Sequence, residues 1–331
     1  MNRVLAMLTA CALCLAGMQF STAAASGVEN ENGFNYCIED GTVTIIGYTG
    51  EDPAVVVPET IAGYPVTQIG NIAFQENLTI TSVVLPETIE AIGFSAFSHC
   101  KNLETINFPD PLETIGNYAF TSCLRLQAID LKQVESIGDC AFQLCISLKE
   151  IVVPGSVSYI PDHAFQDCSA VTSLIIEEGV LEISEDAALN MYNLKEITIP
   201  ASVTVIGAHA LGFTYYDPDY TPTAAEIHGM IGSAAESYAK TNGFDFIPGP
   251  MALGDLNGDS LADANDAAMV LVAAAAKGAG APSGLVSVQE TAADADKSGD
   301  YDASDAAYIL EYAAKAALGG MGSFESYMAA R

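Results

Sequence analysis

Apolar residues between positions 26 and 247 recur with a period of about 23 residues, which is much longer than the period of a helix or a strand and is typical of a repeat architecture. Each period contains a landmark isoleucine, and the landmarks are evenly spaced along the chain: Ile69, Ile92, Ile115, Ile137, Ile160, Ile183 and Ile206. Four positions later comes a small residue, which is followed by a bulky one in most copies: Ala73-Phe74, Ala96-Phe97, Ala119-Phe120, Ala141-Phe142, Ala164-Phe165 and Ala210-Leu211, with Ala187-Ala188 in the degenerate sixth unit.

A second apolar set keeps the same period and alternates with polar residues, which is typical of a short strand that buries one face. Its pairs are Ile106 and Phe108, Ile129 and Leu131, Ile151 and Val153, Leu174 and Ile176, and Ile197 and Ile199. One such unit cannot bury its apolar face alone, whereas stacked units share a continuous core. The pattern therefore predicts a solenoid of about seven units with short parallel strands.

The unit has the form L-x-x-I-x-L-P-x-x-V-x-x-I-G-x-x-A-F-x-x-C, and in this form it resembles the bacterial surface leucine-rich repeats of the BspA-like class. The resemblance covers about two-thirds of the chain. Segments 40–66 and 227–239 are similar to the N- and C-terminal caps of such arrays. The resemblance implies a leucine-rich repeat solenoid with a long surface for a protein or polysaccharide ligand.

Six cysteines follow the N-terminal apolar segment: Cys37, Cys100, Cys123, Cys140, Cys145 and Cys168. Four of them lie three positions after a repeat phenylalanine, so they share one position of the unit and should point inward as small apolar residues. Neighbouring turns are close enough for disulfides, and an exported chain permits them. We favour free buried thiols. We expect no catalytic cysteine, because the histidines are scattered along the chain and those in the repeat segments should be exposed or half-packed.

One stretch of the array, Gly212 to Ala225, departs from the repeat and is rich in tyrosine and aspartate. We expect a long loop here. Its aromatic and acidic side chains are of the kinds that recognise a sugar or a peptide. A purely structural role is the interpretation that we favour for it.

The N-terminal segment 1–25 has the pattern of a secretory signal peptide. Arg3 precedes an apolar run from Val4 to Gly17, and Ala23-Ala24-Ala25 offers a cleavage site before Ser26. The run is too short to span a bilayer, which needs about 20 residues. The chain has 42 acidic against 11 basic residues and a net charge of −31. We therefore expect a secreted protein without a membrane span that does not bind nucleic acid.

An acidic pattern occurs twice near the C-terminus. Oxygen-bearing side chains fall at positions 1, 3, 5, 9 and 12 of each copy: Asp255, Asn257, Asp259, Asp263 and Asp266, then Asp294, Asp296, Ser298, Asp302 and Asp305. A 12-residue loop with this spacing can wrap one Ca²⁺, which takes six or more oxygen ligands. Each copy runs into an alanine-rich segment that predicts a helix, 267–276 and 306–317.

This duplicated segment resembles a type I dockerin, a small all-α module of two EF-hand-like calcium loops that binds a cohesin in a cellulosome. The resemblance implies two Ca²⁺ ions, with a backbone carbonyl from Leu261 and from Asp300 at position 7 of the loops. Ser260 departs from the glycine normally found at position 6, whereas Gly299 keeps it. We therefore expect the first site to be the weaker one.

The resemblance also places the cohesin contacts at positions 10, 11, 17, 18 and 22 of each copy. They are Ala264, Asn265, Leu271, Val272 and Ala276, then Ala303, Ser304, Leu310, Glu311 and Lys315. These residues lack the full pattern of hydroxyl and basic groups of the best-known dockerins, so we expect a different type of cohesin. For Leu271 and Leu310, burial in the helix core is an equally weighted alternative.

The chain therefore predicts an α+β protein with a signal peptide at 1–25, the solenoid at 26–247, a linker at 248–252, the dockerin at 253–320 and a tail at 321–331. Motifs of metalloproteases, serine hydrolases and phosphate-binding loops are missing, and there is no tryptophan. We expect a non-catalytic, secreted interaction protein that a cohesin module of a scaffold protein anchors in a cell-surface cellulosome. One alternative is a cell-surface adhesin. The other is a cellulosomal enzyme subunit that acts on polysaccharide, which the missing catalytic motifs make the less favoured of the two.

Overall fold

The computed structural model describes residues 29–216, 218–249, 251–257, 261–318 and 322–331. The predicted signal peptide and Pro250, Asp259 and Ser260 lie outside these residues. The chain forms two compact units, one of residues up to 227 together with 238–245, and one of residues 228–237 together with 246–331.

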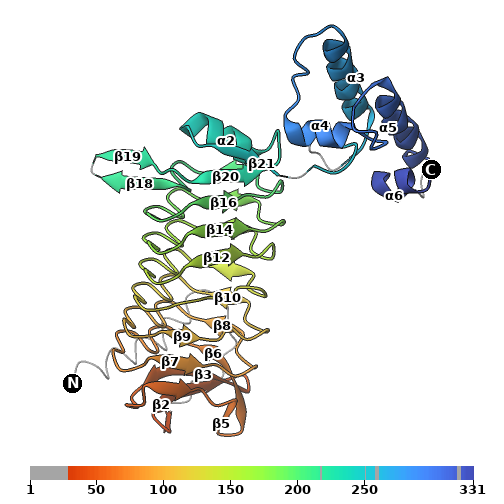
Figure 1. The fold of residues 1–331 in the computed structure, drawn as a ribbon. Helices are drawn as coiled ribbons and strands as arrows, with labels where there is room; N and C mark the ends of the chain where they lie inside the picture. Colours follow the sequence, from red (N-terminus) through yellow and green to blue (C-terminus); the bar gives the residue numbers. More distant parts are fainter. Residues whose placement is uncertain (1–28, 217, 250, 258–260, 319–321) are drawn as a thin grey trace. The chain divides into compact units, whose positions relative to one another are not determined.

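The first unit is a solenoid of about 9 turns, two more than the landmarks predicted. Its first sheet has the order β1-β2-β3-β6-β8-β10-β11, and β5 pairs with β6. The sheet begins with antiparallel strands β1 (Glu29–Glu31), β2 (Phe34–Glu39) and β3 (Thr42–Tyr48), and it continues in parallel. The remaining strands are β5 (Thr60–Ile61), β6 (Tyr64–Ile69), β8 (Ala91–Ile92), β10 (Thr114–Ile115) and β11 (Ser136–Ile137). Figure 1 shows these strands stacked from turn to turn.

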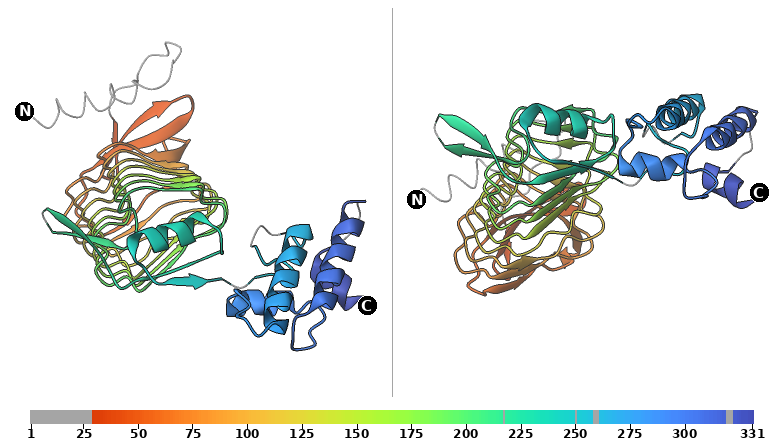
Figure 2. Two further views of the ribbon diagram at one scale, coloured as in Figure 1. Left: turned by 90° about the horizontal axis from the view of Figure 1, so that it is seen from above. Right: turned by 45° about the horizontal axis from the view of Figure 1, so that its top comes forward.

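The landmark isoleucines lie in register along this stack. Ile45 pairs with Ile69, which pairs with Ile92, and the register continues to Ile115 and Ile137. A further sheet of β13 (Tyr159–Ile160), β15 (Glu182–Ile183) and β17 (Val205–Ile206) repeats the same pairing. Viewed along the stack, the turns superpose (Figure 2, left). The predicted period is confirmed, and Ile45 belongs to a turn that the motif did not reveal.

The second apolar set lies in two further sheets. One contains β4 (Ala54–Val56), β7 (Ser82–Val84) and β9 (Thr105–Ile106), and the other has the order β12-β14-β16-β20-β21. The latter strands are β12 (Glu150–Val153), β14 (Ser173–Ile176), β16 (Glu196–Thr198), β20 (Glu226–Gly229) and β21 (Phe246–Pro248). Residues 129–131 form no strand, which corrects our prediction for that unit. The interval from Ile115 to Ile137 is one residue shorter than its neighbours, and the missing position lies between Leu131 and Val134, directly after the expected strand.

On the remaining side of the turns, backbone hydrogen bonds join each turn to the next. Ile72 N–H donates to the carbonyl of Phe94, and Phe74 N–H donates to that of Ala96, each over 2.8 Å. Ile72 has a φ of +55° and the same position is left-handed in the following turns, at Ser95, Tyr118, Cys140, His163, Asp186 and His209. Such a conformation costs about 1–2 kcal/mol for a residue with a side chain. The bonds between turns offset this cost.

Two columns of buried side chains fill the solenoid. The rings of Phe74, Phe97, Phe120, Phe142 and Phe165 stack nearly in parallel, with centroids 4.8 to 5.7 Å apart. The thiols of the four repeat cysteines donate to phenylalanine carbonyls of the preceding turn, as from Cys100 Sγ to Phe74 O over 3.0 Å. The four repeat cysteines are free, buried thiols, so the preferred interpretation is confirmed for them, and Cys37 and Cys140 are buried as well.

The stretch Gly212 to Ala225, expected to be a loop, contains an antiparallel hairpin of β18 (Phe213–Tyr216) and β19 (Asp219–Pro222). Its two strands pair Thr214 with Thr221 and Tyr215 with Tyr220. Helix α2 (Ala234–Asn242) follows β20. Its Tyr238 hydroxyl accepts from the N–H of Leu211 over 3.0 Å and donates to the carbonyl of Leu211 over 2.8 Å. This side chain therefore satisfies backbone groups of the last turn, where no further turn follows.

The second unit contains helices α3 (Ala264–Gly278), α4 (Ser287–Ala293), α5 (Ala303–Ala316) and α6 (Phe324–Ala329). The two alanine-rich helices, α3 and α5, are confirmed, and both begin before the predicted starts. Helix α6 lies in the predicted tail, and its Phe324 is buried in the core with Leu256, Val270 and Ile309. Among the described helices, none is long and apolar enough to cross a bilayer.

Replacing Tyr238 by Phe tests the cap of the solenoid. The variant keeps the ring but leaves the buried N–H of Leu211 without a partner, which costs about 1–3 kcal/mol. We expect the free energy of unfolding, measured by urea denaturation, to fall by this amount. Tyr64→Phe is the control, because Tyr64 is 42% exposed, and it should change stability by less than about 0.5 kcal/mol. Equal stability of both variants would contradict the capping role.

The buried thiols predict a loss of stability at alkaline pH. Burial raises the pKa of Cys100 to about 12, and it also raises the pKa of Cys123, Cys145 and Cys168. Unfolded thiols ionise near pH 8.5, so stability that is full below this pH is lost as the pH rises towards the folded pKa values. We expect urea midpoints to fall steadily from about pH 8.5 upwards. At neutral pH, mass spectrometry should find these thiols alkylated only after unfolding, and rapid alkylation of the native protein would disprove their burial.

Candidate metal centre

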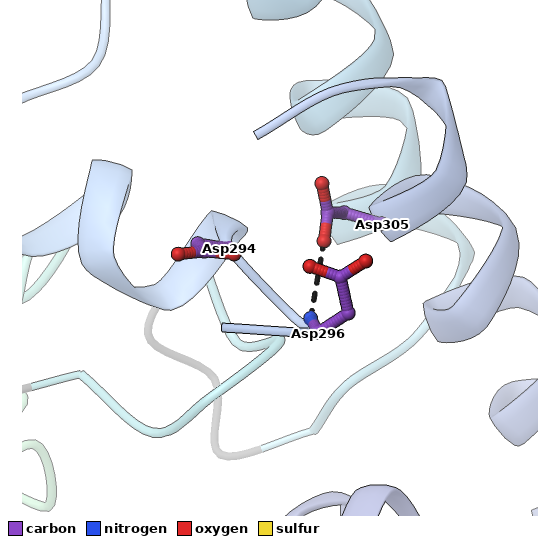
Figure 3. A group of neighbouring side chains, drawn as sticks. All are labelled: Asp294, Asp296 and Asp305. Carbon is purple, nitrogen blue, oxygen red and sulfur yellow. Dashed lines mark hydrogen bonds between the residues drawn. The ribbon is translucent and has the colours of Figure 1, made fainter. Parts of the chain in front are cut away.

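The second acidic loop brings three carboxylates together (Figure 3). Asp294 and Asp296 lie just after α4, and Asp305 lies in the first turn of α5. One oxygen of each lies within 4.8 Å of the others. Two ligands that bind the same Ca²⁺ at about 2.4 Å cannot be more than about 4.8 Å apart. The three carboxylates therefore fit a single ion of this kind.

The backbone of this loop turns around the first carboxylate. Asp294 Oδ1 accepts from the N–H of Ser298, and its Oδ2 accepts from the N–H of Gly299, each over 2.8 Å. Gly299 has a φ of +94°, a conformation that residues with side chains rarely adopt. The glycine at position 6 of the second loop thus has the predicted role. Its counterpart, Ser260, lies outside the described residues.

The last carboxylate of each loop closes that loop with the same hydrogen bonds. Asp305 accepts from the N–H of Asp296 over 3.2 Å and from that of Asp302 over 2.7 Å. In the first loop, Asp266 accepts from the corresponding N–H groups, those of Asn257 over 3.0 Å and Asp263 over 2.9 Å. Both carboxylates are buried. The duplication in the sequence is therefore also a duplication in three dimensions.

The carboxylates at position 9 cap the following helices. Asp263 accepts from the N–H of Asn265 and Asp302 from that of Ser304, each over 2.6 Å. This bond is the main reason why the pKa of Asp302 is lowered. The caps and the positive ends of the helix dipoles hold the acidic side chains at the N-termini of α3 and α5.

The proximity of like charges, one of them buried, makes the second loop electrostatically strained. The pKa of Asp305 is raised, first by its burial and then by the charges of Asp296 and Asp294, although two backbone N–H groups act in the opposite direction. Close carboxylates raise each other's pKa, because neither charge is neutralised. A hard cation would relieve this repulsion. The donor set consists of oxygens only, which suits Ca²⁺ or Mg²⁺ rather than a softer metal.

The other predicted ligands are placed as follows. Ser298 Oγ donates to the carbonyl of Asp300 over 3.0 Å, while the Asp300 side chain forms an ion pair with Lys277. Asp255 is buried, and Leu261 exposes its side chain. Asp259 lies outside the described residues. The first loop therefore repeats the closing bonds of the second, but its ligand set is described only in part.

The predicted cohesin contacts lie mostly on the surface. Leu271 is 42% exposed and Leu310 is 43% exposed, so the alternative of burial in the helix core is wrong for both. Val272 is 69% exposed. The predicted contacts at the helix starts are exposed as well: Ala264, Asn265, Ala303 and Ser304. Ala276 and Glu311 are half-buried.

Two of these predicted contacts bind each other. Lys315 Nζ lies 2.7 Å from Glu311 Oε1, one helical turn earlier in α5, and Arg331 also contacts Glu311. The hydrogen bond from Lys315 is the main reason why the pKa of Glu311 falls to about 2. The predicted contacts in the C-terminal half of α5 therefore belong to an ion-pair network of Glu311, Lys315 and Arg331.

Sequence reasoning missed two residues that hold the loops in place. Gln289 of α4 is buried and donates to the carbonyl of Leu256 over 3.0 Å, which ties α4 to the first loop. The ring of Phe324 packs on Gly254, where a Cβ atom would lie 2.5 Å from it. In the sequence, Phe324 is marked only as an isolated aromatic residue after a glycine-rich segment. Its role in holding the first loop is visible only from the packing of its ring on Gly254.

The comparisons with known proteins concern the solenoid. Residues 67–187 and 131–216 match, in 6 copies, the family described as "BspA type Leucine rich repeat region". The leucine-rich repeat protein TpLRR of T. pallidum is 30% identical, with 55% of this chain and 86% of that chain covered and a TM-score of 0.51. The chain belongs to the BspA-type leucine-rich repeat family. The family region ends before the metal centre.

A second solved structure shares the fold of this BspA-type protein. It is a leucine-rich cell surface protein from Faecalibacterium prausnitzii A2-165, 23% identical, with 63% of this chain and 71% of that chain covered and a TM-score of 0.50. No curated protein matches the chain. BspA-type repeats are interaction modules, and nothing in the described residues points to catalysis.

Replacing Asp296 by Asn tests the metal centre. Loss of one charged ligand from a group of three carboxylates should weaken Ca²⁺ binding at the second loop. The number of ions bound per chain, measured by calorimetric titration, should therefore fall from two to one. Asp300→Asn is the matched control, because the predicted ligand is the backbone carbonyl of residue 300 and not its carboxylate. This variant should still bind two Ca²⁺ ions. If both variants bound two ions with unchanged affinity, the predicted ligand set would be wrong.

Proposed function

We propose that this BspA-type protein is a secreted, non-catalytic interaction protein whose second unit is a dockerin. In this proposal the dockerin binds a cohesin module of a scaffold protein in a Ca²⁺-dependent manner and so anchors the chain in a cellulosome. The solenoid presents a surface for a protein or polysaccharide ligand. The observation that supports the proposal most is the convergence of Asp294, Asp296 and Asp305, one oxygen of each within 4.8 Å of the others.

Two Ca²⁺ ions would be held by the two acidic loops. The first set is Asp255, Asn257, Asp259, the carbonyl of Leu261, Asp263 and Asp266, and the second is Asp294, Asp296, Ser298, the carbonyl of Asp300, Asp302 and Asp305. Each ion supplies the positive charge that the clustered carboxylates lack. Because the ligands converge only in the folded loops, ion binding and folding of this unit should be coupled.

The exposed apolar residues of α3 and α5 supply a docking face. Leu271 and Leu310 occupy the same position of their copies, and their exposures of 42% and 43% are nearly equal. Exposed apolar side chains at equivalent positions suit the core of a protein interface, which is depleted of charges. The ion pair of Glu311 and Lys315 then belongs to the polar rim.

The secretory pattern at the N-terminus and the family support an extracellular location. The F. prausnitzii protein that shares the fold is described as a cell surface protein. The described residues include no helix that could span a membrane. A dockerin would attach the chain at the cell surface through a partner protein.

A capture experiment tests the proposal. Full-length mature protein should be retained by at least one member of a panel of immobilised cohesins in Ca²⁺ and released by a chelator. Leu310→Ala should weaken the binding by about tenfold or more if this residue lies at the centre of the interface. Leu318→Ala is the control, because Leu318 is 88% exposed and lies outside the predicted contacts. Failure of every cohesin to capture the Ca²⁺-loaded protein would refute the dockerin assignment.

A further inference from the structure

A groove of about 460 Å³ lies in the first unit, near the C-terminal end of the solenoid. One wall is the turn from Tyr192 to Glu196, and the other is the segment from Thr223 to Glu226 that leads from the hairpin into β20. The hairpin, β18 and β19, projects from this end of the stack (Figure 1). The groove thus lies where the chain leaves the regular repeat.

The aromatic part of the groove is exposed. Tyr192 lines it and is 46% exposed, and Tyr216 of the hairpin is 65% exposed. The centroids of the two rings lie 6.4 Å apart, so together they form a continuous aromatic surface. In earlier turns the position of Tyr192 is held by Leu124, Ile146 and Ser169, so the ring is particular to this turn.

The polar part of the groove combines donors and acceptors. Its polar lining residues are Asn193, Lys195, Glu196, Thr223 and Glu226. The Asn193 amide already donates to the carbonyl of Ser169 over 2.8 Å, and Thr223 Oγ1 accepts from the N–H of Ala225 over 3.3 Å. Sugar hydroxyls both donate and accept hydrogen bonds, and the faces of sugar rings are apolar enough to pack on aromatic rings. A lining of this composition therefore fits a polyol better than a purely apolar or a singly charged ligand.

We infer that this groove, with the rings of Tyr192 and Tyr216, is a binding site for a neutral oligosaccharide. This inference rests on the proposal that the solenoid is the ligand-binding part of the protein, and it names both the site and the class of ligand. The net charge of −31 opposes acidic glycans, which would approach a strongly negative surface. The groove is shallow and open, as suits a chain of sugars that continues beyond it.

The site is held in shape before any ligand arrives. Glu226 N–H donates to the carbonyl of Lys195 over 2.8 Å and so fixes the two walls to each other. The hairpin is fixed through Tyr215, whose N–H donates to Asn190 Oδ1 over 2.8 Å. On its other strand the Tyr220 hydroxyl donates to Asp186 over 3.1 Å. Such preorganisation reduces the entropy lost on binding.

A peptide that adds a strand is the less favoured ligand at this place. Strand addition needs an unpaired sheet edge. The strand that runs through this turn, β16, is paired on one side with β14 and is followed on the other by β20 in the sheet order. The backbone edge beside the groove is therefore covered, which leaves side-chain recognition.

The test uses the full-length mature protein and an array of immobilised neutral oligosaccharides, made of β-1,4-linked glucose, xylose and mannose, followed by calorimetry with the best glycan. We expect binding to at least one of them. Tyr192→Ala should reduce the affinity by about tenfold or more, while Tyr192→Phe, which keeps the ring, should stay close to the native affinity. Tyr64→Ala is the matched control, because Tyr64 is 42% exposed and lies on β6, several turns away.

The outcomes separate this inference from the dockerin proposal. Glycan binding that is lost in Tyr192→Ala, with capture by a cohesin unchanged, supports the site. No binding to any neutral oligosaccharide, or equal affinities of Tyr192→Ala and Tyr64→Ala, overturns it even if a cohesin captures the protein. Binding of a peptide or of an acidic glycan in this groove, again sensitive to Tyr192→Ala, also overturns the assigned ligand class. Loss of cohesin capture alone leaves the glycan result intact and affects only the dockerin.

Discussion

Each turn of the solenoid is stable only because its neighbours cover it. A single turn has too little apolar surface to offset its loss of conformational entropy, but the stacked phenylalanine rings and the paired isoleucines form one continuous core. Hydrogen bonds join the backbones of successive turns, even where residues such as Ile72 are held in the left-handed region. The ends of the stack need other partners, which explains the antiparallel strands at its start and Tyr238 beside Leu211 at its end.

The second unit depends on a different balance. Its helices are rich in alanine, and its core is small, built around Leu256, Val270, Ile309 and Phe324. Buried carboxylates at two equivalent positions, Asp266 and Asp305, close the loops through backbone N–H groups. In the second loop the charges of Asp294 and Asp296 repel that of Asp305, which opposes folding unless a cation is bound. We propose that Ca²⁺ resolves this conflict, and in that case the ion controls whether the docking face exists.

The two units suit two different tasks. The solenoid belongs to a family of interaction modules, and its irregular end adds the aromatic rings and mixed polar groups that the regular turns lack. The second unit carries apolar residues at equivalent exposed positions of two helices. We interpret the chain as a connector, with ligand recognition in one unit and attachment in the other. The acidic surface fits such a role, since it maintains solubility and attracts cations.

The sequence by itself determined which residues are equivalent. Its period placed Ile92, Phe97 and Cys100 in shared columns, and its duplicated acids gave the spacing of the loops, because equivalent positions of a repeat meet equivalent neighbours. Only the tertiary structure revealed the features that depend on contacts between turns or between helices. These are the left-handed residues, the hairpin that replaces the expected loop, the strand absent at residues 129–131, the burial of Phe324 and the exposure of Leu271 and Leu310. Local propensity cannot reveal them, because hydrogen bonds and packing between segments far apart in the chain outweigh it.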